Sequence, residues 1–577
     1  MMLNKVSRVW NTVRFMTPRQ WKYRLYYTAR NKIRKRVPKQ AGQSLVPVLL
    51  PTFYAPNIGN TDTAAADGIL KNEIPTVSGR TVLFPGDWDL TGEDYRLVCF
   101  RLNSFRWLLE LSDAYKATGN RAYIDKGLAL IRNWQESCGQ FIGGDKWNAY
   151  VIAERITNWI GFCSEYAPDD IAEYARMIEP QAQELKDSLE YQLGANHLLS
   201  EAKALVYAGT FLQDDDLYKT GKELLIAEAK EQFLQDGGHY EQSVSYHVEA
   251  LQQYFEVYAL MSFVNDPDSD KFADLMRKPY CFLNDIIGVN GKIPLFNDAA
   301  YDYPFYDAAD FLATASYIYE SEPPKGRKGL YFRRWNWLGI GNKEITWTGR
   351  TINEGTGLVH YQFGQNEKQY SFYMDCGNNG PDYNLGHTHA DALSVLLCSE
   401  DKEILVDSGV FTYQPGSERN ACRSTAAHNT VEVDGQSSAE VWSAFRVAKR
   451  GHTYISDLTY GDELRVTAFH DGYEKILPSP VGHTRKVEVR GGKIAIRDSL
   501  HSKSEHNAIS RYHIGSNCEV EQTGARTCRI DGHIIVNSDS DMIIRDCIIA
   551  TRFGMPEKAK CLEIAFRSTV QTTFEIE

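Results

Sequence analysis

Residues 383–397, which read YNLGHTHADALSVLL, hold the densest group of side chains that could do chemistry. His387, His389 and Asp391 stand at every second position and precede an apolar run. In an extended strand, side chains at every second position point to the same face. The pattern therefore predicts a strand with three polar groups on one face, which is typical of a metal site, a catalytic base or both.

One class of metal-dependent enzyme, the metallo-β-lactamase type of hydrolase, carries the related motif His-x-His-x-Asp-His. Here Ala392 follows Asp391, so the last ligand of that motif is missing. That fold also alternates strands with helices around the motif, whereas this segment lies inside a continuous β region. Both differences argue against this class.

Two other segments of the same region supply a different metal set. Asp407 ends an apolar run in ILVDSGVFTY, and His428 precedes another in RSTAAHNTVEVDG. His389, Asp407 and His428 together offer two imidazoles and one carboxylate, which suits Zn²⁺ with a water as a further ligand. The alternatives are that Asp407 forms a turn and that His428 is a hydrogen-bonded core residue.

Two candidate segments occur earlier in the chain. Asn196 and His197 stand in YQLGANHLLSEAKAL, where Asn196 either caps the following helix or directs donors at an anionic group beside a cleft. Tyr246 and His247 stand in DGGHYEQSVSYHVEAL, where a loop rich in Gly, Ser and Gln enters a helix. This pair either lines a cleft or packs in a core.

The elements that must position these groups change character along the chain. From about residue 95 to 319, apolar residues recur every three or four positions, which predicts helices joined by short connections. After residues 321–329 the period becomes two. Gly491–Gly492 and Asp531–Gly532 interrupt alternating runs and predict hairpins. We therefore expect a helical domain followed by an all-β domain of stacked antiparallel sheets.

Charge and composition exclude some functions. The 577 residues carry a net charge of -12, which argues against a general nucleic-acid binder. The exception is the first 50 residues, where Lys and Arg alternate with Trp and Tyr between Arg8 and Lys39. This basic aromatic segment either contacts an anionic membrane or polyanion, or packs on its own protein. The oligomeric state is left open.

The cellular compartment is predicted from the absence of a signal segment, a membrane span and a disulfide pattern. No secretory signal and no membrane-spanning stretch are evident. The 11 cysteines are scattered and contain no Cys-x-x-Cys pair, which favours reduced thiols over a disulfide framework. We therefore expect a cytoplasmic protein, or a periplasmic one if a leader has been removed.

Taken together and in this order, the segments resemble the heparinase II/III family of polysaccharide lyases. The most specific part is the Gly-His-x-His-x-Asp segment followed by Asp-Ser-Gly and His-Asn-Thr-Val; GANH, DGGHYEQSVSYH and PLFND also match. The resemblance implies an α+β multidomain fold. A basic segment (1–50) precedes an incomplete α/α toroid catalytic domain (51–330), and an antiparallel β-sandwich (331–577) follows, with the cleft between the two domains.

Such enzymes cleave uronic-acid-containing polysaccharides by β-elimination, which leaves 4,5-unsaturated ends. The C5 proton of a uronate is weakly acidic while its carboxylate is charged, so that charge must be neutralised. A base takes the C5 proton, and an acid protonates the oxygen that leaves C4. The resemblance thus implies an acidic polysaccharide as partner: a glycosaminoglycan, alginate or a bacterial exopolysaccharide.

The resemblance also implies roles for individual residues. Asn196 would bind the uronate carboxylate, with His197 beside it. Tyr246 would protonate the leaving oxygen and, in a syn elimination, also take the proton. His387 would be the base for the opposite epimer or a second partner of the carboxylate.

Further residues of the site are expected around these four. His389, Asp407 and His428 would hold a structural divalent metal, expected to be Zn²⁺, that fixes the strand presenting His387. Candidate substrate-binding residues are Glu201, Glu241, His247 and Arg423. Arg423 is a candidate contact for a sulfate or carboxylate, and Glu201, one helical turn after His197, is a candidate to orient it.

Two other functions stay open. A glycoside hydrolase on the same scaffold would need paired carboxylates, for which Glu154, Glu241 and Asp298 are candidates. A non-catalytic glycan-binding or assembly protein of a polysaccharide export system would use the basic segment at the N-terminus. The polysaccharide itself, and endo or exo action on it, are not determined by the sequence.

Overall fold

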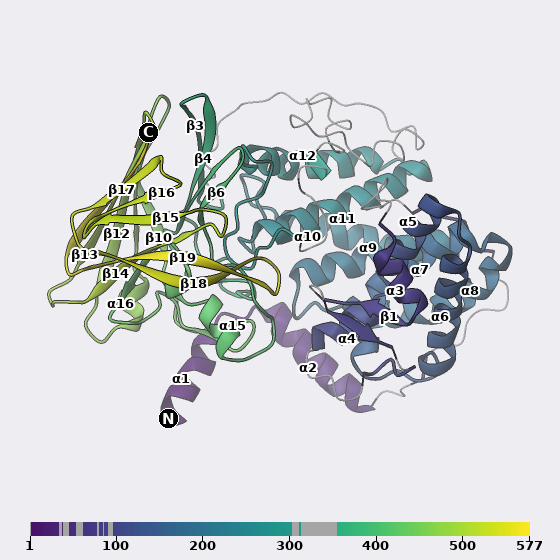
Figure 1. Cartoon of the computed structure of the whole chain (residues 1–577). Coiled ribbons are helices and arrows are strands. Elements are labelled where there is room, and N and C mark those ends of the chain that lie inside the picture. Colours follow the sequence, from purple (N-terminus) through teal and green to yellow (C-terminus); the bar gives the residue numbers. More distant parts are fainter. Residues whose placement is uncertain are drawn as a thin grey trace.

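The structure, a computed structural model, describes residues 2–33, 37–38, 46–52, 62–77, 80–84, 86–90, 96–302, 308, 311, 312, 315 and 355–577. The predicted change of period at residues 321–329 and the predicted domain boundary at residue 330 lie outside these residues. On either side of that segment the two predicted classes are found, with helices up to residue 286 and mainly strands from residue 358 on. Figure 1 shows them as two neighbouring domains.

The helical domain consists of helices that pack in sequential pairs. α5 packs on α6, α7 on α8, α9 on α10 and α11 on α12, and α9 also contacts α7 and α11. The bounds are α3 Ala64–Leu70, α4 Arg96–Asn103, α5 Leu108–Thr118, α6 Ala122–Cys138, α7 Ala149–Tyr166, α8 Ile171–Asp187, α9 Ala195–Leu212, α10 Asp215–Gln232, α11 Val244–Phe263 and α12 Ser269–Ile286, with the small hairpin β1 Glu73–Pro75 and β2 Thr81–Leu83. The predicted helical domain is confirmed.

The close contact between α9 and α10 depends on two glycines. A Cβ on Gly209 would lie 2.3 Å from the backbone nitrogen of Tyr218, and a Cβ on Gly221 would lie 2.5 Å from the carbonyl oxygen of Ala202. Only two residues separate the helices, and the second, Asp214, accepts hydrogen bonds from two N–H groups in the first turn of α10. The pairing fixes α9, whose first turn carries two of the predicted site residues.

The β domain consists of two antiparallel sheets. One has the order β10-β11-β12-β13-β20-β17-β16-β15, and the other has the order β18-β19-β14-β6-β5-β4-β3 with β7 paired to β14. The bounds of the first are β10 Thr453–Tyr460, β11 Leu464–His470, β12 Gly482–Arg490, β13 Lys493–His501, β15 Val520–Gly524, β16 Thr527–Ile530, β17 Ile534–Ser538 and β20 Thr569–Ile576. Those of the second are β3 Leu358–Gln365, β4 Lys368–Asp375, β5 Val395–Ser399, β6 Glu403–Val406, β7 Val431–Val433, β14 Ala508–Ile514, β18 Met542–Arg552 and β19 Met555–Phe566.

Both predicted hairpins are present. The pairing of β12 with β13 extends to Arg490 and Lys493, and Gly491 and Gly492, which both have positive φ, form the turn between them. β16 and β17 pair around the residues 531–532 turn. One hydrophobic core joins apolar side chains of the two sheets, including Leu397 and Ile496. The alternation read from the sequence therefore gives a sandwich with a single core.

The predicted strand at residues 387–391 is wrong. The segment is irregular, and β5 begins only at Val395. Its backbone is held by a side chain of the helical domain, since the N–H of His389 donates to Asn297 Oδ1 at 2.8 Å. The carboxylate of Asp391 accepts from the N–H of Asn297 at 3.0 Å. Side chains have replaced the ladder partners that a strand would need.

The two domains meet along the loops that follow α12. Tyr373 on β4 donates its hydroxyl to the carbonyl of Ile286 at 3.1 Å, and Tyr301 donates its N–H to the carbonyl of Thr551 at 2.9 Å. These contacts join the end of the helical domain to the second sheet. The 383–393 loop and the starts of α9 and α11 consequently lie near the same interface.

The N-terminal segment forms two helices, α1 Met2–Val13 and α2 Pro18–Ile33, which lie along the lower edge of the molecule in Figure 1. On α1, Arg8 pairs with Glu440 at 2.9 Å in the β domain. On α2, Arg19 pairs with Glu228 on α10 at 2.9 Å, and Gln20 donates to the carbonyl of Tyr383 at 3.1 Å. The segment thus packs on both domains, as the second of its two predicted alternatives expects, while contact with an anionic membrane or polyanion stays a prediction.

Two further predictions concern membrane-spanning helices and the state of the cysteines. Across the described ranges, no helix combines the length and the hydropathy of a membrane span. The eleven cysteines are unpaired thiols, of which eight are buried and Cys281, Cys518 and Cys547 are partly exposed.

Candidate active site

Asn196 lies in the first turn of α9 and does not cap the helix, because the N-cap position is Gly194. Its side-chain amide donates to Glu249 Oε2 on α11 at 3.2 Å. One of the two amide hydrogens is thereby used, and the second can be directed at a ligand. The capping alternative is therefore excluded, and the cleft alternative fits.

His197 is held by a glutamate from the loop before α9. Its Nδ1 lies 2.7 Å from Glu190 Oε2, and its ring stacks on Tyr150 with centroids 4.5 Å apart. The predicted partner Glu201 does not contact the ring: it is fully buried and accepts from the backbone N–H of Glu190 at 2.7 Å. Glu201 thus fixes the loop that carries the true partner, and the predicted orienting role belongs to Glu190.

The charge of Glu190 fits this role. Burial alone would raise the pKa of its carboxyl group, but the hydrogen bond and the charge of His197 outweigh burial and lower the pKa. The carboxylate form therefore faces His197 Nδ1, which leaves the Nε2 of His197 on the opposite side of the ring. The His197 side chain is about one third exposed, so this nitrogen is open to a ligand.

Tyr246 and His387 form the centre of the candidate site. The two rings are stacked, with centroids 3.7 Å apart and planes inclined by 26°. The hydroxyl of Tyr246 lies 3.0 Å from the hydroxyl of Tyr413, and either can be the donor. When Tyr413 donates to Tyr246, the hydroxyl of Tyr246 can in turn act as a proton donor.

Asp298 connects both histidines of the 383–393 loop. Its carboxylate lies 2.9 Å from His387 Nδ1 and 2.8 Å from His389 Nε2, and Arg419 donates to both of its oxygens at 2.5 and 2.6 Å. Burial alone would raise the pKa of Asp298, but Arg419 and the two histidines hold it well below its usual range. The group is thus a permanent anion that fixes the tautomer of His387.

His387 is consequently arranged as a base. Because Nδ1 donates to Asp298, the neutral ring carries its lone pair on Nε2. Burial lowers the pKa of His387, and the contribution of Asp298 offsets this only in part. The ring is neutral near pH 7 and can accept a proton at Nε2.

Glu241 lies beside this nitrogen, with Oε1 3.8 Å from His387 Nε2. Burial, followed by the charges of Glu249 and Asp298, raises its pKa to about 8, and a hydrogen bond from the backbone of Asn196 lowers it only in part. Its Oε2 is buried and accepts no hydrogen bond from any described residue. A neutral carboxylic acid at this position is a hydrogen-bond donor between Asn196 and His387.

Two of the predicted substrate-binding residues do not face the site. His247 is 1% exposed, and its Nε2 bonds to the carbonyl of Pro279 on α12 at 3.1 Å. It points away from the direction of Tyr246 because successive residues of a helix point about 100° apart. Arg423 is fully buried, and its guanidinium donates to the carbonyls of Thr388 and Ala444. Both side chains are buried and bonded within the protein, and their substrate-binding roles stay predictions.

Comparison with known proteins supplies the family. Residues 20–311 match the family described as Heparinase II/III N-terminus, and residues 357–577 match Heparinase II/III-like, C-terminal. The chain belongs to the heparinase II/III family.

It is 26% identical over 226 residues to a heparin-sulfate lyase of Bacteroides thetaiotaomicron, a match that covers 34% of this chain and 31% of the relative. It is 22% identical over 371 residues to a heparin-sulfate lyase of Pedobacter heparinus, covering 61% of this chain and 54% of the relative. The chain thus spans about a third to a half of the curated relatives it matches.

Solved structures show the fold of this heparinase II/III chain. The crystal structure of heparinase III is similar with a TM-score of 0.71 at 17% identity, covering 99% of this chain and 93% of the other. A heparan sulfate lyase mutant from Pedobacter heparinus is similar with a TM-score of 0.59 at 17% identity, covering 96% and 87%. The predicted fold class, an α/α toroid followed by an antiparallel β-sandwich, is confirmed.

The predicted metal residues of the heparinase II/III chain lie together but bond to other groups. His428 Nδ1 lies 2.6 Å from Asp407 Oδ2, His389 Nε2 is taken by Asp298, and the two imidazole centroids are 5.2 Å apart. No three His, Cys, Asp or Glu side chains within the described residues are grouped as metal ligands. Two buried nitrogens, His389 Nδ1 and His428 Nε2, nevertheless have no hydrogen-bond partner among the described residues, and this donor pair fits a divalent cation. The Zn²⁺ site stays a prediction.

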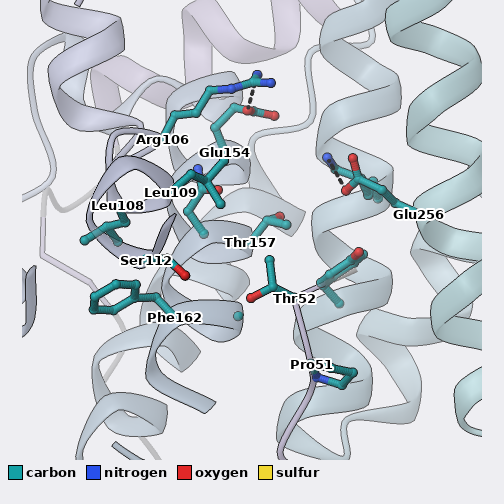
Figure 2. Close-up of a pocket in the computed structure, with 14 residues that line it drawn as sticks. Pro51, Thr52, Arg106, Leu108, Leu109, Ser112, Glu154, Thr157, Phe162 and Glu256 are labelled. Carbon is teal, nitrogen blue, oxygen red and sulfur yellow. Dashed lines mark hydrogen bonds and ion pairs between the residues drawn. The ribbon is translucent and has the colours of Figure 1, made fainter. Parts of the chain in front are cut away.

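A pocket in the helical domain holds the other carboxylate predicted for a hydrolase (Figure 2). Glu154 faces Arg106 there at 3.9 Å, and Glu256 pairs with Lys203 at 3.1 Å. The lining of this pocket includes neither Tyr246 nor any other residue of the candidate site. Glu154 thus faces Arg106 and Asp298 is engaged by Arg419, so both candidate partners of Glu241 in a hydrolase are paired with cations.

Proposed function

We propose that this protein is a polysaccharide lyase that cleaves a uronic-acid-containing polysaccharide by β-elimination. The observation that carries the proposal is the stacked pair of Tyr246 and His387 beside Asn196 and Glu241. An acid and a base lie in direct contact, next to donors that suit a carboxylate. The names of the two curated relatives, both heparin-sulfate lyases, support a glycosaminoglycan as the substrate class.

The first task of such an enzyme is to neutralise the uronate carboxylate. The second amide hydrogen of Asn196 and the neutral carboxyl group of Glu241 are two donors for it, and His197 follows Asn196 in the same helical turn. Donors that are fixed before the substrate binds stabilise the developing enolate-like anion without reorganisation. Glu241 therefore acts in its protonated form.

The second task is proton transfer. The C5–H bond breaks as His387 Nε2 takes the proton, the C4–O bond breaks as the hydroxyl of Tyr246 protonates the leaving oxygen, and the C4–C5 double bond forms. Asp298 stabilises the imidazolium through Nδ1. For the opposite C5 configuration, the phenolate form of Tyr246 takes the C5 proton and passes it to the oxygen that leaves C4, on the same face of the sugar.

We also propose that His389 and His428, with Asp407, hold a structural divalent cation. The two buried imidazole nitrogens without hydrogen-bond partners among described residues support this assignment. When bound, the cation would cross-link the loop that carries His387 to the end of β6. It takes no part in the proton transfers.

The decisive experiment is a substrate panel. Heparan sulfate, heparin, hyaluronan, chondroitin sulfate, alginate and a bacterial exopolysaccharide are incubated with the protein, and the ultraviolet absorbance of the new 4,5 double bond is followed. We expect absorbance to grow with at least one polymer. Chain shortening with saturated ends only would support the hydrolase instead, and binding without turnover on any polymer would support the non-catalytic alternative.

A further inference from the structure

The first two helices have an inner face that is fully used. On α1, Thr12 accepts from the indole of Trp442 at 3.2 Å, and on α2 the ring of Tyr23 stacks on Tyr191 with centroids 4.4 Å apart. The hydroxyl of Tyr27 donates to the carbonyl of Leu189 at 2.5 Å. Packing on the two domains therefore accounts for this face and leaves the opposite one to be explained.

The outer face of these helices exposes large apolar side chains. Trp10 is 62% exposed, Leu25 67% and Ile33 85%. The full set that we call the outer face is Val6, Val9, Trp10, Trp21, Leu25, Tyr26 and Ile33. Val6, Val9 and Trp10 follow the spacing of one helical stripe, and Trp21 and Leu25 do the same on α2. Isolated apolar residues on a surface need no explanation, but a continuous set on two helices does.

The same segment is exclusively basic. The first acidic residue of the chain is Asp62, whereas Lys and Arg occur throughout residues 5–39. Lys22 and Lys32 lie on α2 and Arg14 follows α1; all three are exposed, and none forms an ion pair with a residue that the structure describes. The remainder of the chain is acidic, since the net charge of the whole is -12. The outer face is thus apolar and positively charged on an otherwise acidic protein.

We propose that the outer face of α1 and α2 docks on an anionic lipid surface. Lys and Arg would bind the headgroups, while Trp, Leu and Ile enter the boundary between headgroups and acyl chains. A polyanionic glycan would match the charges but would leave the apolar stripe in water. Because the inner face holds both domains, docking would fix the cleft at a membrane. This inference does not depend on the proposed lyase activity.

The test uses the full chain in vesicle flotation. Vesicles of phosphatidylcholine alone are compared with vesicles that also contain phosphatidylglycerol, at low and high salt. We expect roughly tenfold stronger retention on the anionic vesicles at low salt, with most of it lost at high salt. Equal retention on the two vesicle types, or none, overturns the proposal.

Matched variants locate the surface. Trp10→Ser/Trp21→Ser/Leu25→Ser and Arg14→Gln/Lys22→Gln/Lys32→Gln should each lose vesicle retention. The control Ile543→Ser/Ile548→Ser removes equally exposed side chains from β18 and should bind as the parent does. Retention on heparin-agarose that falls in the charge variant while vesicle binding persists would assign the surface to a glycan and contradict the proposal.

Quenching of tryptophan fluorescence by brominated lipids is a second test, and it uses substitutions that keep the apolar face. Brominated acyl chains quench tryptophan fluorescence only when the indole enters the bilayer. We expect quenching for the parent and a large loss of quenching for Trp10→Phe/Trp21→Phe, which keeps the apolar face and should still bind. Binding of this variant with unchanged quenching would place other tryptophans at the lipid and refute the assignment.

Discussion

The imidazole of His387 lies directly on the phenol ring of Tyr246, with 3.7 Å between their centroids. One residue comes from the loop before β5 and the other from the first turn of α11, so the contact exists only when the two domains are joined. A base and an acid in contact can exchange their protons after each elimination through one water molecule. The stacking of Tyr246 on His387 therefore favours a mechanism in which both proton transfers occur at the same place in the site.

Replacing Tyr246 by Phe should reduce kcat by at least about a hundredfold, because the leaving oxygen loses its proton donor. The free energy of unfolding should fall by about 1 kcal/mol, since the change removes the hydroxyl that bonds to Tyr413. Product absorbance and denaturant unfolding measure the two effects. Tyr258→Phe, a buried tyrosine on the same helix, is the control and should keep full activity. Turnover within twofold of the parent would contradict the assigned acid.

Activity should fall as the pH rises through about 8, the pKa to which burial and the nearby carboxylates raise Glu241. Deprotonation removes a donor to the uronate and adds a repelling charge. Glu241→Gln keeps a donor at every pH, so its activity should lack this decline. Loss of all turnover in this variant at every pH would instead indicate a hydrolytic carboxylate.

The same carboxyl group should make stability depend on pH. Its pKa is raised from 4.5 to about 8 in the folded protein, so the folded state binds more protons than the unfolded state between these values. The free energy of unfolding therefore falls as the pH rises across this window, by several kcal/mol at most. Glu241→Gln should flatten that slope in urea titrations. An identical slope in parent and variant would show that the group titrates normally.

Asp298→Asn should lower the free energy of unfolding by about 3–5 kcal/mol, because it leaves Arg419 buried without its anion. The double variant Asp298→Asn/Arg419→Met removes the stranded charge as well. We expect the double variant to be more stable than the single one. Additive losses in this mutant cycle would mean that the two groups are not coupled.

Arg423→Lys should destabilise the protein by about 2 kcal/mol, because one ammonium group cannot bond to both Thr388 and Ala444. The ratio of kcat/KM on sulfated and desulfated heparan sulfate should stay as in the parent. A selective loss on the sulfated polymer at unchanged stability would support the substrate-binding role predicted from the sequence.

Metal analysis of the purified protein should give about one equivalent of a divalent ion. His428→Ala should lose that ion and unfold at a lower temperature, and chelation should lower the parent to the same temperature. His513→Ala, a buried histidine on β14, is the control and should keep the ion. A metal-free parent whose stability ignores chelators would remove the cation from the site.

Local chemistry explains what could be read from the sequence. Spacing of apolar residues and the Gly491–Gly492 turn depend on neighbours in the chain, and they predicted the helical and β domains correctly. The sequence did not show which of two neighbouring residues would face the site: Tyr246 faces His387, while His247 faces α12. Only the packing of α11 determines which of the two lies at the candidate site.

The missed residues depend on contacts that are distant in the sequence. The sequence presents Asp298 only as a candidate hydrolytic carboxylate and gives no signal for Arg419, because 121 residues separate the two. The four-residue spacing from His197 pointed to Glu201, whereas the partner came from the preceding loop, at Glu190. The irregular segment at residues 387–391 is set by Asn297 of the other domain, which no pattern within the segment could indicate.

The helices that pack on both domains also impose an order on biosynthesis. Arg8 and Glu440 are 432 residues apart in the chain. At ribosomal speeds of 5–20 residues per second, roughly 20 to 90 s pass before the partner of α1 is made. During that time both faces of α1 are uncovered on the nascent chain, so α1 can dock only after the β domain has been synthesised as far as Glu440.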